Sequence, residues 1–179
     1  MAKNVLIISA SPRRHGNSDL LCDQFQKGAE ESGNTVEKIF LKDKKIGYCS
    51  GCGYCFEHHV CSQKDDMAEL LEKVIAADVI VLATPVYFYS MDAQMKCFID
   101  RTTPRYTEIS NKEFYFILAA ADTNKKMMQR TMETFRGFTE DCLEGAKEAG
   151  VIYGVGAYQI GEIKDTPAWQ EAYEMGKQA

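Results

Sequence analysis

Three runs of consecutive apolar residues constrain the fold more than any other feature of the sequence. They are VLII at residues 5–8, VIVLAT at residues 79–84 and FYFILAAA at residues 114–121. A strand with one wet face alternates apolar and polar side chains, whereas a strand covered on both faces is apolar at nearly every position. The runs therefore predict the central strands of a sheet that has helices on both sides.

Helical patterns alternate with these and two further strand patterns along the chain. Asn17 or Ser18 is expected to cap the first helix and Asp65 or Asp66 the second, and Pro85 is expected to end the third strand. The expected strands are residues 4–10, 35–41, 79–84, 114–121 and 151–158, and the other expected helices are residues 91–101, 125–149 and 166–178. This order predicts an α/β fold with a doubly wound, five-stranded parallel sheet.

The flavodoxin-like strand order, 2-1-3-4-5 with strands numbered along the chain, places a ligand crevice at the carboxyl ends of strands 1 and 3, where the winding reverses. The 179 residues suit a single domain, 1–179, with a cysteine-rich loop at residues 47–63. The N-terminal MAKNVLIISASP has none of the marks of an export signal, so we expect a cytoplasmic protein. The net charge of −5 shows no basic footprint for nucleic acid, and no stretch is long enough to span a membrane.

The loop after the first expected strand, SASPRRHGNS at residues 9–18, has the groups that bind a phosphate monoester. Hydroxyl and amide side chains lie next to a helix start, where free backbone N–H groups and the helix dipole favour an anion. Neither G-x-x-x-x-G-K-[ST] nor G-x-G-x-x-G is present, so FMN suits the loop better than a dinucleotide. The alternative is a polar connection with an ordinary helix cap. The candidate ligands are Ser9, Ser11, Arg13, Asn17 and Ser18.

The loop after the third strand, TPVYFYSM at residues 84–91, brings three aromatic residues to the same crevice. A loop begun by proline can present backbone N–H groups to the pyrimidine edge of a flavin, while Tyr87 and Phe88 form a wall for the ring. Taken alone, these aromatics are better explained as core residues that pack under the next helix. Since both loops end at one crevice, together they favour flavin mononucleotide.

Cys49, Cys52, Cys55 and Cys61 follow the spacing C-x2-C-x2-C-x5-C. Structural disulfides are uncommon in a reducing compartment, so metal binding or redox chemistry is favoured. An iron-sulfur cluster suits three thiols two residues apart, with Gly51 and Gly53 permitting tight turns. Structural zinc more often takes two separated pairs of ligands. A third interpretation is a metal-free loop that covers the flavin.

The loop motifs ASPRRHGNS and ATPVYFYSM resemble those of the flavodoxin-like NAD(P)H-dependent FMN reductases, and the cysteine spacing makes the chain similar to the iron-sulfur flavoproteins. The resemblance implies that the first loop holds the FMN phosphate and that the second lines the isoalloxazine. The loop after the fourth strand, AADTNKK, lacks the glycine of many relatives, which leaves the role of Asp122 open. The residues carried over are Ser11, Arg13, Asn17 and Ser18 for the phosphate, and Pro85, Val86, Tyr87 and Phe88 for the ring, with Ser90 nearby.

These observations predict an FMN-dependent electron-transfer oxidoreductase whose flavin is coupled to a [4Fe-4S] cluster, with NAD(P)H as a possible electron donor. No catalytic acid, base or nucleophile is needed, because the cofactor supplies the chemistry. The alternatives are a cluster-free NAD(P)H-dependent FMN or quinone reductase and a non-enzymatic, flavodoxin-like electron carrier. The resemblance also implies a homodimer or homotetramer and a redox partner such as ferredoxin.

Overall fold

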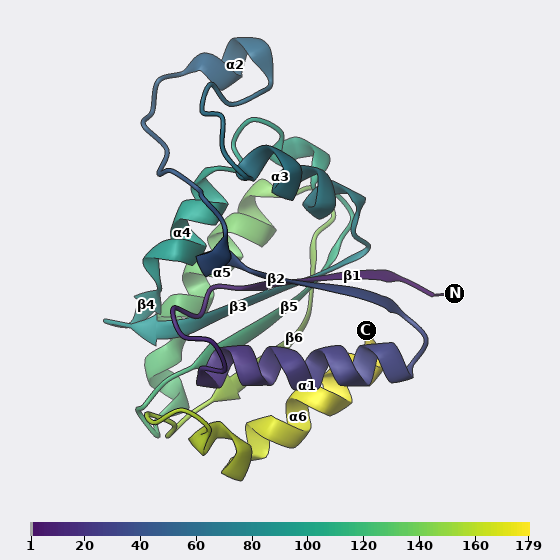
Figure 1. Ribbon diagram of the computed structural model, residues 1–179, viewed down its shortest axis with the longest axis vertical. Helices are drawn as coiled ribbons and strands as arrows, with labels where there is room; N and C mark the ends of the chain where they lie inside the picture. The colour runs from purple at the N-terminus through teal and green to yellow at the C-terminus, as the bar shows by residue number, and fades with distance from the viewer. Residues whose placement is uncertain (1) are drawn as a thin grey trace.

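A parallel β-sheet runs through the middle of the computed structural model, which describes residues 2–179 (Figure 1). Its strands lie in the order β2-β1-β3-β5-β6, which confirms the order expected from the sequence. A short strand, β4 (Ser90–Met91), pairs antiparallel with the end of β3. The parallel strands are β1 (Asn4–Ser9), β2 (Thr35–Phe40), β3 (Val79–Tyr87), β5 (Glu113–Ala119) and β6 (Lys147–Gly154).

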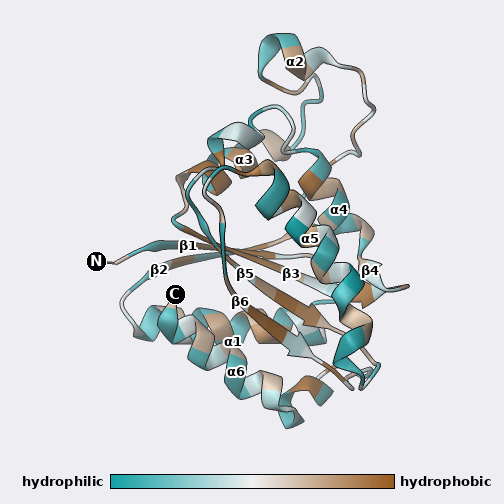
Figure 2. Cartoon of the chain, turned by 180° about the vertical axis from the view of Figure 1, so that it is seen from behind, coloured by the Kyte–Doolittle hydropathy of each residue, from teal (hydrophilic) through white to brown (hydrophobic). Residues whose placement is uncertain are grey.

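Helices cover both faces of the sheet, as the uninterrupted apolar runs predicted. One face packs on α1 (Asn17–Glu31) and α6 (Pro167–Gln178), and the other on α3 (Met67–Ala76), α4 (Ala93–Asp100) and α5 (Gln129–Cys142). The apolar strands lie between helices whose outer surfaces are hydrophilic (Figure 2). Within residues 2–179, no helix combines the length and apolar character that crossing a bilayer requires.

Two glycines bring α1 and α6 into close contact. A Cβ atom at Gly28 would lie 2.1 Å from the carbonyl oxygen of Tyr173, and one at Gly176 would lie 2.1 Å from that of Phe25. These contacts are to backbone atoms, which cannot swing aside as a side chain can. The two helices can therefore pack this closely only because neither position carries a side chain.

Besides the last strand, which was expected at residues 151–158 but runs from Lys147 to Gly154, the sequence-based bounds were wrong in three places. β3 does not end before Pro85 but continues to Tyr87. On one side Pro85 pairs with β5, and on the other side β1 already ends opposite Ala83. The missing N–H of Pro85 therefore interrupts no hydrogen bond to β1. The helix expected at residues 125–149 begins with a 3-10 turn (Lys125–Met128) and ends at Cys142. Burial of Leu143 in an extended conformation and the positive φ of Gly145 turn the chain into β6.

The third correction concerns the start of α4. A helix was expected from residue 91, but Met91 pairs with Val86 in the β3–β4 hairpin. Asp92 then caps α4 by accepting a hydrogen bond from the backbone N–H of Met95 (3.0 Å). The helix therefore begins at Ala93, directly after the hairpin that borders the crevice.

Candidate cofactor sites

A cavity of about 540 Å³ opens at the carboxyl ends of the strands, at the point where the winding of the sheet reverses. We call it the switch-point cavity. Four chain segments line it: the loop after β1, the end of β3, the end of β5 with the residues that follow it, and the loop after β6. The lining residues are Ser11, Pro12, Arg13, Asn17, Ser18, Pro85, Val86, Tyr87, Ala119, Ala120, Ala121, Ala157, Tyr158 and Gln159.

The loop after β1 is folded around the hydroxyl of Ser11. This hydroxyl donates a hydrogen bond to the carbonyl oxygen of Arg13 (2.7 Å) and accepts one from the Arg13 backbone N–H (3.3 Å). A Cβ atom on Gly16 would lie 2.5 Å from the same oxygen, so the turn requires glycine at this position. The expectation that Asn17 or Ser18 caps α1 was wrong: the N-cap is Gly16, both residues lie inside the helix, and among the described residues no side chain caps it. The first N–H groups of α1 are consequently free to bind an anion in the cavity.

Asn17 joins two walls of the cavity. Its side-chain amide donates to the carbonyl oxygens of Ala157 and Gln159 (both 3.0 Å) and accepts from the backbone N–H of Gly161 (3.1 Å). Because both ends of the amide are engaged, Asn17 positions the loop after β6, while its backbone N–H remains at the helix start. Sequence reasoning assigned the side chain directly to the phosphate.

Ser9 lies outside the switch-point cavity. It is fully buried at the end of β1, and its hydroxyl donates to the carboxylate of Asp19 (2.8 Å), which also pairs with Lys38 (3.2 Å). Of the residues expected in this loop, the structure thus brings Ser11, Arg13, Asn17 and Ser18 together at the cavity. It places Ser9 in the polar contacts beneath α1.

The loop after β3 is a tight hairpin. Phe88 and Tyr89 occupy its two-residue turn with φ values of 49° and 65°, a left-handed conformation that is unfavourable for bulky side chains. Pro85, Val86 and Tyr87 line the cavity, whereas Phe88 points away with a fully exposed side chain. Ser90 pairs with Tyr87 and does not line the cavity. The aromatic wall expected from two residues is therefore provided by Tyr87.

A buried carboxyl group supports this hairpin from below. The hydroxyl of Thr84 accepts a hydrogen bond from the Asp92 backbone N–H (3.0 Å), and Asp92 is only 4% exposed. One of its carboxylate oxygens, Oδ2, has no hydrogen-bond partner within residues 2–179. Burial raises the pKa of Asp92 to about 6. Sequence reasoning missed this residue, which gives no signal beyond that of an ordinary helix cap.

Alanines form much of the part of the cavity that sequence reasoning did not find, and Pro12, Tyr158 and Gln159 complete it. Ala119 ends β5, Ala120 and Ala121 follow it, and Ala157 lies after β6; their short side chains leave room between the ends of the strands. The carboxylate of Asp122, expected near the flavin, instead accepts a hydrogen bond from the Asn124 backbone N–H (2.7 Å) and does not line the cavity. The run of alanines at the end of an apolar strand was the available signal.

The cysteine-rich loop, which we call the cysteine segment (residues 47–63), projects from the body and carries the short helix α2 (Tyr54–His58) at its tip (Figure 1). Gly51 and Gly53 adopt positive φ values of 66° and 76° on either side of Cys52. Four free thiols of this segment line a common hollow of about 80 Å³. They belong to Cys49, Cys52, Cys55 and Cys61.

The geometry of the thiols discriminates between possible metals. A tetrahedral zinc ion with Zn–S bonds of about 2.3 Å would place its sulfur ligands about 3.8 Å apart. Within the described part of the chain, no three of these sulfurs all lie within 4.8 Å of one another. A cubane cluster holds its four thiolates farther apart than a single ion does. In the arrangement described, no three of these thiols are close enough together to bind one zinc ion.

Hydrogen bonds in the segment favour a thiolate at one ligand position. The backbone N–H of Tyr54 and the hydroxyls of Ser62 and Ser50 lower the pKa of the Cys52 thiol. The Ser62 hydroxyl lies 3.7 Å from the Cys52 sulfur. Since thiolates are the form that binds iron, this local chemistry also fits a metal ligand.

Comparison with known proteins finds similarity to the two groups that the sequence motifs resemble, the FMN reductases and the iron-sulfur flavoproteins. Residues 3–138 match the model of the family described as NADPH-dependent FMN reductase. An iron-sulfur flavoprotein of Archaeoglobus fulgidus is 47% identical over 97 residues, which are 54% of this chain and 44% of the relative. The chain spans about half the length of the curated relatives that it matches first.

Solved structures share the fold over almost the entire chain. The NAD(P)H:quinone oxidoreductase of Methanothermobacter marburgensis superimposes with a TM-score of 0.77 and 15% identity, covering 99% of this chain and 96% of its own. An FMN-dependent NADH-azoreductase of Bacillus anthracis, solved in complex with FMN, has a TM-score of 0.75 and 16% identity, covering 98% of each chain. These similarities establish the doubly wound, flavodoxin-like fold.

Proposed function

The chain belongs to the NADPH-dependent FMN reductase family, and from this premise we propose that it is a flavin-dependent oxidoreductase that binds FMN in the switch-point cavity. One observation carries the proposal: a single cavity combines an uncapped helix start with the end of β3 and the aromatic side chain of Tyr87. The helix start suits a phosphate, and the hairpin suits a planar ring. Bound FMN supplies the redox chemistry, accepting two electrons from NAD(P)H and releasing them singly.

The protein's own residues position the cofactor. The N–H groups at the start of α1 and the guanidinium of Arg13 neutralise the phosphate. Arg13 makes one long hydrogen bond, 3.5 Å to the carbonyl oxygen of Tyr158, so most of its donors are available. The Pro85–Tyr87 segment lies against the ring, with the Tyr87 side chain as an aromatic wall. In this proposal no side chain serves as a nucleophile or as a general acid or base.

We further propose that Cys49, Cys52, Cys55 and Cys61 hold a [4Fe-4S] cluster that exchanges single electrons with the flavin. Their common hollow and the naming of the similar relatives as iron-sulfur flavoproteins support this assignment. The acceptor would then be a one-electron carrier such as ferredoxin. The strongly exposed aromatic residues on the two projecting segments, Tyr48 and Phe56 on one and Phe88 on the other, support assembly into a homodimer or homotetramer.

A cluster-free NAD(P)H-dependent quinone reductase is the second candidate. It is supported by the fold that this chain shares with the NAD(P)H:quinone oxidoreductase of Methanothermobacter marburgensis. A simple flavodoxin-like carrier would show slow NAD(P)H oxidation but rapid transfer between proteins.

The test is anaerobic stopped-flow reduction by NADPH or NADH. Wild-type protein should lose its flavin absorbance and then reduce an external one-electron acceptor. The double variant Cys52→Ala/Cys55→Ala should retain flavin reduction but lose onward transfer, whereas Cys142→Ala, which removes an exposed thiol outside the segment, should retain both. Equal onward transfer in the double variant would exclude the cluster from the electron path. Failure to bind added FMN would overturn the proposal altogether.

A further inference from the structure

An arginine is buried where α4 ends, below the cysteine segment. Arg101 is only 2% exposed and is among the largest fully buried side chains of the described residues. A buried guanidinium is costly unless an opposite charge and hydrogen bonds compensate for its lost hydration. The partners that compensate for it therefore indicate what the residue does.

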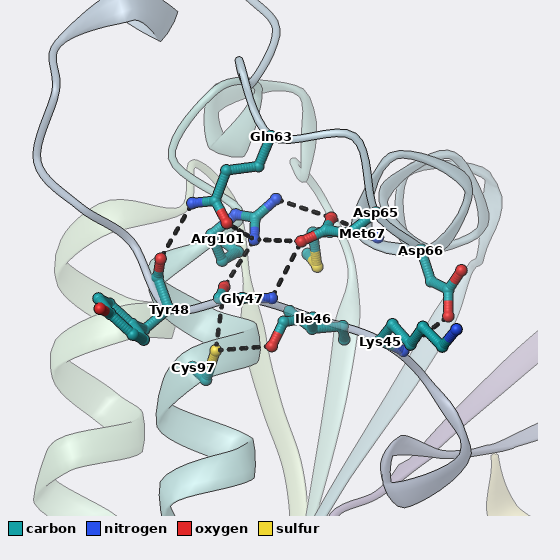
Figure 3. Close-up of polar contacts among 10 residues, drawn as sticks. All are labelled: Lys45, Ile46, Gly47, Tyr48, Gln63, Asp65, Asp66, Met67, Cys97 and Arg101. Carbon is teal, nitrogen blue, oxygen red and sulfur yellow. Dashed lines mark hydrogen bonds and ion pairs between the residues drawn. The ribbon is translucent and has the colours of Figure 1, made fainter.

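These partners belong to both stems of the cysteine segment (Figure 3). On the stem that enters the segment, Nη1 donates to the carbonyl oxygen of Gly47 (2.6 Å). On the stem that leaves it, Nη1 and Nη2 donate to the two carboxylate oxygens of Asp65 (2.7 and 2.9 Å), and Nη1 also approaches Oε1 of Gln63 (3.3 Å). One side chain thus joins two stretches of backbone that are separated by all four cysteines.

Further hydrogen bonds close the same junction. The Gly47 N–H donates to Asp65 (2.9 Å), and the side-chain amide of Gln63 donates to the carbonyl oxygen of Tyr48 (2.9 Å). The Cys97 thiol, one turn earlier on α4, donates to the Gly47 carbonyl (3.4 Å). Because the segment beyond the junction is largely exposed, these contacts fix where it leaves the body.

Arg101 also has one hydrogen-bond donor that no contact of the junction uses. Its Nε has no hydrogen-bond partner among residues 2–179, although it is buried. Arg101 and Cys61 line the same hollow as the other three cysteines. Because a guanidinium stays protonated in proteins, Arg101 holds a permanent positive charge beside this hollow.

We propose that Arg101 is a positioning residue that clamps the stems of the cysteine segment and places a fixed positive charge beside Cys61, favouring the reduced state of the bound cluster. The charge part rests on the cluster assigned under the proposed function, whereas the clamp does not. Reduction adds negative charge to a cluster, and a nearby buried cation stabilises that charge. The charge of Arg101 therefore raises the reduction potential, while its planar fork holds the ligands together.

The clamp is tested by amide hydrogen exchange of the cluster-free chain with FMN bound. Arg101→Met should speed exchange at Gly47 and Asp66 by about tenfold or more, because the Gly47 N–H donates to Asp65 and the Asp66 N–H to the Lys45 carbonyl oxygen across the junction that opens. The control is Arg105→Met, which removes a neighbouring arginine paired with Glu72 and Glu108 rather than with the stems. Unchanged exchange in Arg101→Met, or equal acceleration in Arg105→Met, would overturn the clamp.

The charge is tested by redox titration of the reconstituted protein, followed through the spectrum of the cluster. Arg101→Met should lower the ratio of reduced to oxidised cluster about tenfold at a fixed potential, a shift of about 59 mV for one electron. Arg101→Lys retains the charge without the fork, so its potential should stay near that of the wild type while the stems exchange faster. Asp65→Asn also breaks the clamp, but it removes a negative charge and keeps the positive charge of Arg101. The reduction potential of the cluster in this variant should therefore not fall.

Two results would contradict the charge assignment. One is a reduction potential in Arg101→Met equal to that of the wild type. The other is a reduction potential that falls equally in Arg101→Lys and Asp65→Asn, which would mean that loosening the stems is enough to change the potential. If wild-type protein binds FMN but no iron or sulfide, the proposed cluster and the charge role fail together. The hydrogen-exchange comparison then still decides whether Arg101 clamps the segment.

Discussion

The switch-point cavity and the cysteine segment are two sites built in different ways. The walls of the cavity are the ends of β1, β3, β5 and β6, whose positions are fixed by backbone ladders and by helices on both faces. The cysteine segment lies outside the sheet and is joined to it by side-chain contacts at its stems. A flavin site can thus be specified by the fold itself, whereas a cluster site can be added to that fold through a few anchoring residues.

The largest expected effect would separate the two sites completely. Replacing Cys49, Cys52, Cys55 and Cys61 by alanine should abolish iron binding while leaving FMN affinity and the free energy of unfolding near their wild-type values. All four side chains lie in an exposed or half-buried segment, so little core packing is lost. Metal analysis, flavin titration and denaturant unfolding measure the three quantities. Loss of FMN binding would show that the cavity depends on the segment.

A second change tests whether stability resides in the layered body. Gly176→Ala should lower the free energy of unfolding by about 3 kcal/mol, since its Cβ would meet the backbone of Phe25. Gly137→Ala is the matched control on α5, where the nearest atom outside the helix backbone lies 4.0 Å away. It should stabilise the protein by about 0.5–1 kcal/mol. Equal effects of the two substitutions in urea unfolding would contradict the close packing of α1 on α6.

A third change tests how much the buried carboxyl group under the β3–β4 hairpin lowers the free energy of unfolding. Asp92 has a pKa of about 6 in the folded protein and an ordinary value of 3.8 when unfolded. Between these values the unfolded chain loses its proton first, so wild-type stability should fall as the pH rises from about 4 to 6. Above pH 6 the loss is complete and amounts to about 2–3 kcal/mol, at 1.36 kcal/mol per pKa unit.

Asp92→Asn should remove this contribution while retaining a cap for α4, so the variant should be more stable than wild type at pH 8 and similar to it at pH 4. Asp92→Ser also retains a capping oxygen and should show the same loss of pH dependence. Unfolding free energies measured at both pH values provide the comparison. Unchanged pH dependence in both variants would show that the carboxyl group under the hairpin carries no such cost.

The smallest expected effect probes one ligand within the cavity. Arg13→Met should weaken FMN binding about tenfold, or about 1.4 kcal/mol, through loss of one charged contact to phosphate. Arg14→Met is the control, because Arg14 pairs with Asp43 (2.5 Å) and lies over the Phe40 ring rather than lining the cavity. Flavin fluorescence titration distinguishes them. Equal weakening would point to general electrostatic attraction instead of a phosphate contact at Arg13.

The sequence predicted most where local patterns decide the structure. Uninterrupted apolar runs predicted the central strands, the alternation of strands and helices led to the flavodoxin-like strand order, and the loops after β1 and β3 were correctly placed at one crevice. The hairpin beyond Pro85 was missed, because a proline ordinarily ends a strand and only the free flank of β3 permits it here.

Features that depend on distant residues could not be read from the sequence. From the sequence, the side-chain amide of Asn17 was interpreted as a phosphate ligand. In the structure it binds the loop after β6, which is about 140 positions away in the sequence. Arg101 lies 36 positions from Asp65 and 54 from Gly47, and no local pattern connects them. The four cysteines were evident from their spacing, but the clamp that anchors their segment is a product of the tertiary structure.

The most direct test of two independent cofactor sites is the content of FMN, iron and acid-labile sulfide in protein prepared and reconstituted without oxygen. Wild-type chain should contain about one FMN, four iron and four sulfide per chain. The four-cysteine variant should retain the FMN and lose the iron and sulfide. Wild-type protein with stoichiometric FMN and no iron or sulfide, or a variant that loses FMN together with the iron, would contradict this account.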